Sequence, residues 1–364
     1  MGGTRIGMDT GKSITKYPTP YARPSVVPRC ARPASPVPGR VRDGRAQTTD
    51  NRRRHQHEHH HGGAMIDIGM GSVQISECDQ MGHLNVRYYV ARADEALANL
   101  AHALGMGPRA LRAQGLRLGV LDHHIRFIGE LHVGAPFRFR GGVLGRDADT
   151  LVVLQEMRNT ATDALAATFR VEVGLFDAAS GERRPLPALP GADALRMELP
   201  AHAAPKGLNL TTPRARPHWD EAERLGLEER HVGAVSAREC DRDGWLTTDG
   251  IIARVWDGAS NLPWRRPPPG PQTVKIGGAA LEYRLHYHAT PRAGDLITVR
   301  SGLREIGTKT TVATNWLFDR ESGLACATAE LVGVRFDLST RKALEIDDET
   351  RARMLPYVKA GLAV

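Results

Sequence analysis

The sequence predicts an α+β fold made of two tandem units, each a long helix against an antiparallel sheet of about five strands. Three observations support this prediction. A helical pattern of apolar residues follows Asn85, several strand patterns with short Gly- and Asp-rich links come next, and the whole arrangement returns about 160 residues later. The length of 364 residues suits two domains of ordinary size.

The first unit begins with a strand and a long helix. Residues 66–78 alternate between apolar and polar side chains, as a strand does. Apolar residues then recur with helical spacing, at Val86, Tyr89, Val90, Ala93, Leu97, Leu100 and Leu104. Asn85 is a suitable N-cap and Gly105 a suitable stop, and a short second helix is expected over 108–114.

Strand patterns fill the rest of this unit. They cover residues 118–131, 136–143, 150–158 and 164–175. The links between them are short and rich in Gly and Asp, which favours antiparallel hairpins over crossover helices.

The same unit is repeated in the second half of the chain. A shift of 162 residues aligns 77–100 with 239–262, with 9 of 24 positions identical, and a shift of 160 aligns 121–177 with 281–337 without a gap. Two copies of one unit in one chain indicate a pseudo-twofold arrangement, that is, an internal pseudo-dimer, which could pair again into a larger oligomer.

The repeat sets the expected domain boundaries. They are a disordered basic tail rich in Pro, Arg and His (1–64), a first unit with the intact motif (65–177), a linker (178–225), a second unit with a degenerate motif (226–345) and a C-terminal helical tail (346–364).

The charge distribution argues against nucleic-acid binding. The tail holds 12 basic and 4 acidic residues, whereas the remainder holds 37 of each, so the net charge of +8 belongs entirely to the tail. No apolar run is long enough to span a bilayer. The four cysteines show no C-x-x-C spacing, which predicts neither a disulfide framework nor a zinc site and favours a reducing compartment such as the cytoplasm.

The stretch between the first strand and the long helix carries the chemistry. Asp79, Gly82, His83 and Asn85 lie where the free N–H groups of the helix point back towards the turn. Such amides can stabilise an oxyanion, and a neighbouring carboxylate or imidazole can activate water or attack a carbonyl. Asp79 and Asn85 have an alternative role, because Asp before a helix binds backbone amides and Asn is a common cap.

The second copy separates these interpretations. Asp241 retains the acid and Thr247 replaces Asn85 with another good cap, whereas His83 becomes Trp245, which cannot titrate. The comparison therefore identifies His83 as the functional group and favours structural roles for the acid and the cap. Cys78 as a nucleophile is disfavoured because the copy without the imidazole keeps Cys240.

These residues resemble a known family. The pattern Asp-x-x-Gly-His-x-Asn-x-x-x-Tyr, read here as Asp79, Gly82, His83, Asn85 and Tyr89, followed by an amphipathic helix and an antiparallel sheet, resembles the hot-dog fold, and more narrowly its 4-hydroxybenzoyl-CoA thioesterase-like branch. The resemblance covers roughly 66–177 and, more faintly, 231–340.

The resemblance implies hydrolysis of acyl-CoA or acyl-carrier-protein thioesters without a cofactor or metal. It implies that Asp79 is the general base or nucleophile, that His83 and Asn85 position water or substrate, and that Gly82, Leu84 and Tyr89 belong to the substrate-binding surface. Tandem acyl-carrier-protein thioesterases share this plan but keep their catalytic residues in the second unit, which does not match this chain.

Two alternatives remain open at this point. A hot-dog enoyl- or hydroxyacyl-thioester hydratase would share the fold, although its usual Asp-x-x-x-x-His motif is not found on the helix. A non-catalytic acyl-thioester-binding protein would explain why one copy of the motif has decayed.

Overall fold

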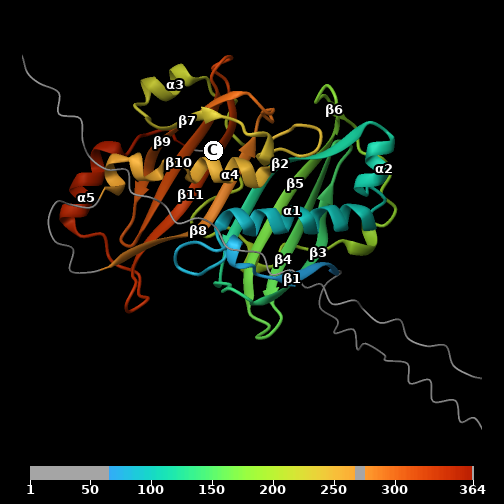
Figure 1. Cartoon of the computed structure of the whole chain (residues 1–364), viewed down its shortest axis with the longest axis horizontal. Coiled ribbons are helices and arrows are strands. Elements are labelled where there is room, and N and C mark those ends of the chain that lie inside the picture. Colours follow the sequence, from blue (N-terminus) through green and yellow to red (C-terminus); the bar gives the residue numbers. More distant parts are fainter. Residues whose placement is uncertain (1–64, 267–274, 363–364) are drawn as a thin grey trace, which may run out of the picture. The chain divides into compact units, whose positions relative to one another are not determined.

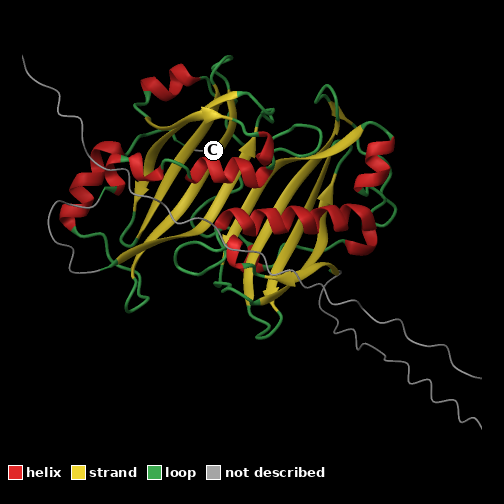
Figure 2. Ribbon diagram, in the orientation of Figure 1, coloured by secondary structure: helices red, strands yellow, loops and turns green. Residues whose placement is uncertain are grey.

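The computed structural model describes residues 65–266 and 275–362. The tail 1–64, with its predicted disorder and its His-rich tract, lies outside the described residues. The described chain forms an eleven-stranded sheet with the helices α1 (Val86–Ala103) and α4 (Thr248–Trp256) against one face (Figures 1 and 2). No helix within the described ranges is long and apolar enough to cross a membrane.

The first half follows the order predicted for one unit. After α1 comes the short helix α2 (Pro108–Ala113). The strands of this half are β1 (Ile66–Ser72), β2 (Leu116–Phe127), β3 (Pro136–Arg146), β4 (Thr150–Asn159), β5 (Leu165–Asp177) and the two-residue β6 (Arg183–Arg184).

The second half repeats the order of one strand, one helix and four strands, and has an additional short helix at each end. It begins with the short helix α3 (Trp219–Arg224) and ends with the helix α5 (Asp348–Met354). Its strands are β7 (Glu228–Ala234), β8 (Ile276–Tyr287), β9 (Leu296–Ile306), β10 (Thr310–Asp319) and β11 (Ala325–Asp337).

The two halves share one sheet through their central strands. The strand order is β1-β3-β4-β5-β2-β8-β11-β10-β9-β7, so corresponding strands follow one another from each edge to the centre. β2 and β8 pair antiparallel around the partners His124 and Arg284. These two residues are 160 apart, which is the repeat shift of the strands, so each occupies the same position in its half.

The helix α1 buries the face that its apolar period predicts. Six of its residues with that spacing, and Ala96 and Ala101 beside them, pack on the sheet. The core cluster continues past the central strands to α4 and β8, where it includes Ile251 and Tyr283. Because burial of apolar surface is the main stabilising term, this shared core holds both halves together.

Two expectations about the elements are wrong. The first strand ends at Ser72 and is followed by a 3₁₀ turn at Ile75–Glu77, so it is shorter than predicted. The helix of the second half has nine residues against eighteen in α1. It ends at Trp256, after which Asp257 is extended and Gly258 adopts φ 71°. A Cβ at Gly258 would clash with the carbonyl oxygen of Arg230, whereas α1 continues with Ala96 at the corresponding position.

The segment after β6 crosses the sheet face opposite the helices and covers a buried charged cluster. Arg284 contacts Asp122 across the central strands at 3.3 Å, and His124 contacts Glu282 at 2.6 Å. The backbone N–H of Gly207 in the crossing segment donates to Glu282 at 2.7 Å. Burial alone would raise the pKa of Glu282, but the bonds from His124 and from this segment hold it below its ordinary value.

This arrangement predicts a pH-dependent role for Glu282. At pH 7, Glu282→Gln should lower the free energy of unfolding by about 2 kcal/mol, because charge-assisted hydrogen bonds to a buried group are weakened. The folded-state pKa lies below the unfolded value of 4.5. The stabilisation is therefore complete above that pH and is lost as the pH falls through the folded pKa, so the difference from wild type should shrink in acid.

Urea denaturation between pH 7 and pH 3.5 measures the effect, with Glu305→Gln at an exposed site of β9 as the control. A Glu282→Gln loss that stays constant over this pH range would contradict the assignment.

Candidate functional site

The turn before α1 is held by its own acid. The carboxylate Oδ1 of Asp79 accepts hydrogen bonds from the backbone N–H of Met81 at 2.8 Å and of His83 at 3.4 Å. Gly82 has φ 77°, a conformation that glycine adopts without strain, and donates to the carbonyl of Asp79. Asp79 therefore shapes the turn that presents His83.

The second turn has the same construction. Oδ1 of Asp241 accepts from the N–H groups of Asp243 and Trp245, each at 2.9 Å, and Gly244 has φ 85°. The acid therefore has the same turn-forming contacts in both halves. The copy comparison in the sequence favoured this structural role for the acid, and the geometry agrees with it.

Asn85 and Thr247 are the N-caps of the two helices. Oδ1 of Asn85 accepts from the N–H of Arg87 at 3.0 Å, and the hydroxyl of Thr247 accepts from the N–H of Gly250 at 3.2 Å. Each cap satisfies one of the helix's free amides. In α1 the N–H of Arg87 binds the Asn85 side chain and those of Tyr88 and Tyr89 bind its carbonyl, which leaves the N–H of Val86 directed towards the turn.

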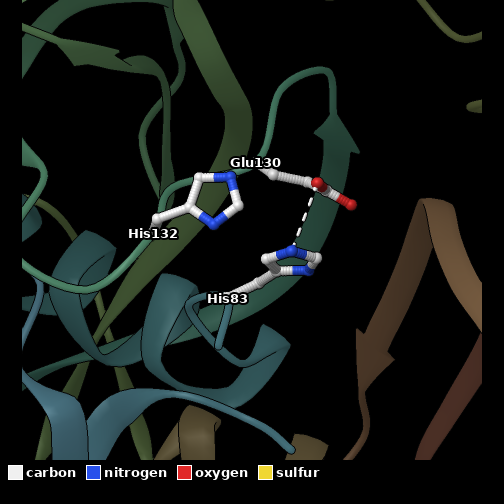
Figure 3. A group of neighbouring side chains, drawn as sticks. All are labelled: His83, Glu130 and His132. Carbon is white, nitrogen blue, oxygen red and sulfur yellow. Dashed lines mark ion pairs between the residues drawn. The ribbon is translucent and has the colours of Figure 1, made fainter. Parts of the chain in front are cut away.

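His83 lies in a cluster with two residues of the loop after β2. Its Nε2 is 3.4 Å from the Oε2 of Glu130, and its ring packs edge-to-face on His132 with centroids 4.7 Å apart. Figure 3 shows both imidazoles beside the Glu130 carboxylate, and the dashed line marks the ion pair. The carboxylate therefore faces the His83 ring at ion-pairing distance.

Glu130 is also bound from the other half of the chain. Arg341, in the turn after β11, donates to both oxygens of its carboxylate. Arg341 is one of two described non-glycine residues with positive φ, at 58°. The corresponding residue of the first half is Gly181, with φ 74°. A positive φ at an arginine costs about 1 kcal/mol of folding free energy relative to glycine. The side chain offsets this cost by binding the Glu130 carboxylate, which glycine could not do.

Tyr89 fixes the loop that carries Glu130 and His132. Its hydroxyl donates to the carbonyl of Gly129 at 3.1 Å and accepts from the N–H of Leu131 at 3.2 Å. Burial raises the pKa of Tyr89, so the hydroxyl stays neutral and can do both.

The corresponding cluster of the second half has been replaced as a whole. The positions of His83, Glu130 and His132 are occupied in the second half by Trp245, Thr290 and Arg292, respectively. The guanidinium of Arg292 lies 3.8 Å from the Trp245 ring centroid, and the indole N–H donates to the carbonyl of Ala178. This stack holds the turn after β5 and has no group for proton transfer.

The side chains of His83, Glu130 and His132 could also be read as metal ligands. Among the described residues, their nitrogen and oxygen atoms lie within 4.8 Å of one another, as those of a metal site do. The guanidinium of Arg341 already neutralises Glu130, and a cation beside it would be repelled. We therefore interpret the group as an ion-paired cluster.

A cavity of about 360 Å³ lies between α1 and the second turn. Asp94 of α1 lines it and binds the hydroxyl of Thr248 at the start of α4. Burial raises the pKa of Asp94 to about 7, the Thr248 hydrogen bond opposes this, and the charges of Asp249 and Glu95 add to it. The sequence predicted no role for Asp94.

The comparison with protein families agrees with this geometry. The model of the thioesterase-like superfamily matches residues 73–198, which include the first turn, α1 and the His83 cluster. These residues belong to the thioesterase-like superfamily. No curated protein sequence matches the chain.

Solved thioesterases have a fold similar to that of this chain. The 12:0-ACP thioesterase of Umbellularia californica is 11% identical with a TM-score of 0.58, over 75% of this chain and 95% of that one. An acyl-ACP thioesterase of Bacteroides thetaiotaomicron is 11% identical with a TM-score of 0.53, over 74% and 98%. A Lactobacillus plantarum protein assigned as an oleoyl thioesterase is 10% identical with a TM-score of 0.57, over 75% and 97%. The hot-dog thioesterase fold expected from the motif is confirmed.

The thioesterase-like domain brings together some of the residues that the sequence singled out. Asp79, Gly82, His83 and Asn85 share the turn, whereas the side chain of Leu84 is buried in the core. Burial and the neighbouring acids raise the pKa of Cys78, which disfavours its thiolate as a nucleophile. Sequence reasoning missed Glu130, His132 and Arg341, although the repeat shows that each has a different residue at the corresponding position of the other half.

The conformation of Arg341 predicts an unusual stability result. Arg341→Gly should change the free energy of unfolding by less than about 1 kcal/mol, because losing a half-exposed ion pair is offset by relief of backbone strain. Arg341→Ala loses the same ion pair but keeps the strain, and should be less stable than the glycine variant by about 1 kcal/mol. Urea denaturation measures both, and equal stabilities would contradict the strain assignment.

Proposed function

We propose that the protein hydrolyses acyl thioesters, of CoA or of an acyl carrier protein, to the free acid and the thiol, without a cofactor. The observation that carries this proposal is the oriented His83 at the N-terminus of α1, inside the segment that belongs to the thioesterase-like superfamily. The three described cysteines are free, which suits a reducing compartment such as the cytoplasm.

The residues of the first turn suit the steps of this reaction. The N–H of Val86 and the positive end of the α1 dipole can polarise the thioester carbonyl and stabilise the oxyanion that forms when water attacks. His83, oriented by Glu130, accepts the proton of that water. When the C–S bond breaks, the imidazolium returns the proton to the leaving thiolate, so no other reactant is needed.

The roles of the neighbouring residues follow from their contacts. Asp79 uses Oδ1 to hold the turn, so its part as general base or nucleophile rests on the resemblance of the motif. Asn85 caps α1 by accepting the N–H of Arg87 and so fixes where the helix begins beside the turn. Tyr89 holds the loop of Glu130, and Gly82 lets the backbone approach the substrate closely.

We also propose that the two halves are two hot-dog units forming an internal pseudo-dimer. Support comes from pairs that join equivalent positions. His124 pairs with Arg284 in the sheet, and Arg87 of α1 binds Asp249 of α4 at 2.9 Å across a separation of 162 residues, the repeat shift of the helices. Both pairs lie where a twofold axis between the units would pass. The second unit completes the first site by supplying Arg341.

The proposal is tested with a panel of acyl-CoAs of different chain length and aryl groups, in which a thiol reagent detects released CoA. We expect turnover with at least one of them. His83→Ala should lower kcat at least 100-fold, because the group that transfers the proton is lost. The far-UV circular dichroism of the variant should match that of the wild type.

The control is His102→Ala, an exposed imidazole in the last turn of α1, which should keep wild-type kcat. Arg341→Gly should lower kcat in the wild-type background and have no further effect when combined with His83→Ala, since it acts through that imidazole. A panel without CoA release above background would overturn the proposal.

A further inference from the structure

We propose that a cavity enclosed by α4, α5 and the sheet of the second half binds a small organic anion, whose charged group pairs with Arg230. The cavity has a volume of about 610 Å³, and its lining residues all come from the second half, between Arg230 and Met354. It is therefore a different space from the cavity at Asp94. The proposal goes beyond thioester hydrolysis and does not depend on it, since the superfamily match ends at residue 198.

The repeat shows how this cavity arises. In the first half α1 continues over the equivalent part of the sheet, whereas α4 ends after nine residues (Figure 1). The strands beneath also exchange large core residues for smaller ones: Leu151, Val153 and Val173 of the first half correspond to Thr311, Ala313 and Gly333. The three larger residues are buried in the core, and the three smaller ones line the cavity. Several matched changes along the chain have therefore opened this space.

Arg230 lines the cavity at a position that is apolar in the first half. A β-bulge in β7 makes it the extra residue between Glu229 and His231, and the corresponding bulge residue of β1 is Ile68, which is buried in the core. Arg230 is only 6% exposed, and its Nε and Nη2 have no hydrogen-bond partner among the described residues. Burial lowers the pKa of Arg230 to about 10, so the guanidinium stays charged at neutral pH. A buried cation without a partner is costly, and a bound anion would supply that partner.

Other polar groups around the cavity also lack an acceptor. The buried Asn315 lines the cavity and accepts from the Ser301 hydroxyl at 2.9 Å, but its Nδ2 has no partner in the part of the chain that the structure describes. The same is true of the Trp256 indole Nε1 and the Tyr283 hydroxyl, whose rings lie 6.5 Å apart. All of these groups can donate hydrogen bonds. The cavity therefore suits a ligand rich in acceptor oxygens, such as a carboxylate or a phosphate.

The charges around the cavity also favour an anion. Seven arginines and lysines line it, and no Asp or Glu is among the described residues that do so. The charge of Asp257 acts on Arg230, but its carboxylate pairs with His231 and Arg254, which do not line the cavity. Like charges gathered in one partly desolvated space repel one another, and an anion between them relieves this repulsion.

The remaining walls suit an apolar or aromatic body. They include the side chains of Trp256, Leu262, Trp264, Leu303 and Ile346. The volume lies within the range of small-molecule sites. A ligand that places an aromatic ring against the indoles and its anionic group at the guanidinium would satisfy both kinds of wall.

Isothermal titration of the full chain at pH 7.5 tests the proposal with two anions, phenyl phosphate and phenylacetate, and with the neutral 2-phenylethanol. At least one of the anions should bind, and the alcohol should bind at least tenfold more weakly. Tighter binding of phenyl phosphate would identify a site for phosphate monoesters, and tighter binding of phenylacetate a site for carboxylates. Either result supports an organic-anion site.

Variants of Arg230 test its part in binding. Arg230→Ile resembles the first half, where Ile68 occupies this position, and should weaken binding of the anion at least tenfold with an unchanged far-UV circular dichroism spectrum. Arg230→Lys keeps the charge and should bind more tightly than the isoleucine variant. The control is Arg320→Ile, an exposed arginine of the second half outside the cavity, which should bind as the wild type does.

Filling the cavity tests its place. The double variant Gly278→Leu/Gly333→Val introduces the residues that the first half has at these positions, and a Cβ at either glycine would meet its nearest neighbour at an ordinary contact distance, 3.8 Å and 3.7 Å respectively. It should weaken binding of the anion at least fivefold. The proposal is overturned if neither anion binds, if the alcohol binds as tightly as the anions, or if Arg230→Ile or the double variant keeps wild-type affinity. No thioester is used, so these results stand apart from those of the acyl-CoA panel.

Discussion

The antiparallel pairing of β2 with β8 is the contact on which the rest of the structure depends. It joins the two halves into one sheet and places His124 opposite Arg284, with Asp122 and Glu282 as their buried charged partners. Buried charges are costly unless each is paired, so the partners on both strands specify one register. If one strand slipped by one residue, these charged side chains would face the apolar core and the core side chains would face away from it.

This register decides where the ends of the strands lie. The turn after β11 reaches the loop of the first half that carries Glu130, and the turn after β5 reaches Trp245. The two contacts are related by the repeat but differ in chemistry. One orients an imidazole through a carboxylate, and the other packs an indole between an arginine and a backbone carbonyl. The halves have thus kept the same scaffold and diverged at the contact that touches the turn.

Local patterns predicted much of this architecture. The apolar period of α1, the cap Asn85 and the turn glycine Gly82 depend on neighbours in the sequence, and each lies where the pattern placed it. The repeat also directed attention to His83. Glu130 and Arg341 could not be paired from the sequence, because 211 residues separate them and only the β2–β8 register brings them together. Asp94 was missed for the same reason, since Thr248 and the surrounding cavity belong to distant elements.

The central claim is that the two halves form one cooperative body with the His83 cluster at their boundary. Native-state hydrogen exchange at increasing denaturant tests it most directly, because it reports the opening free energy of each strand separately. The shared core and the β2–β8 pairing predict that the slowest amides of β2, β5, β8 and β11 all exchange through one global opening with the same free energy. Exchange of β8 and β11 at a clearly lower free energy, while β2 and β5 stay protected, would show that the halves unfold independently and would contradict the claim.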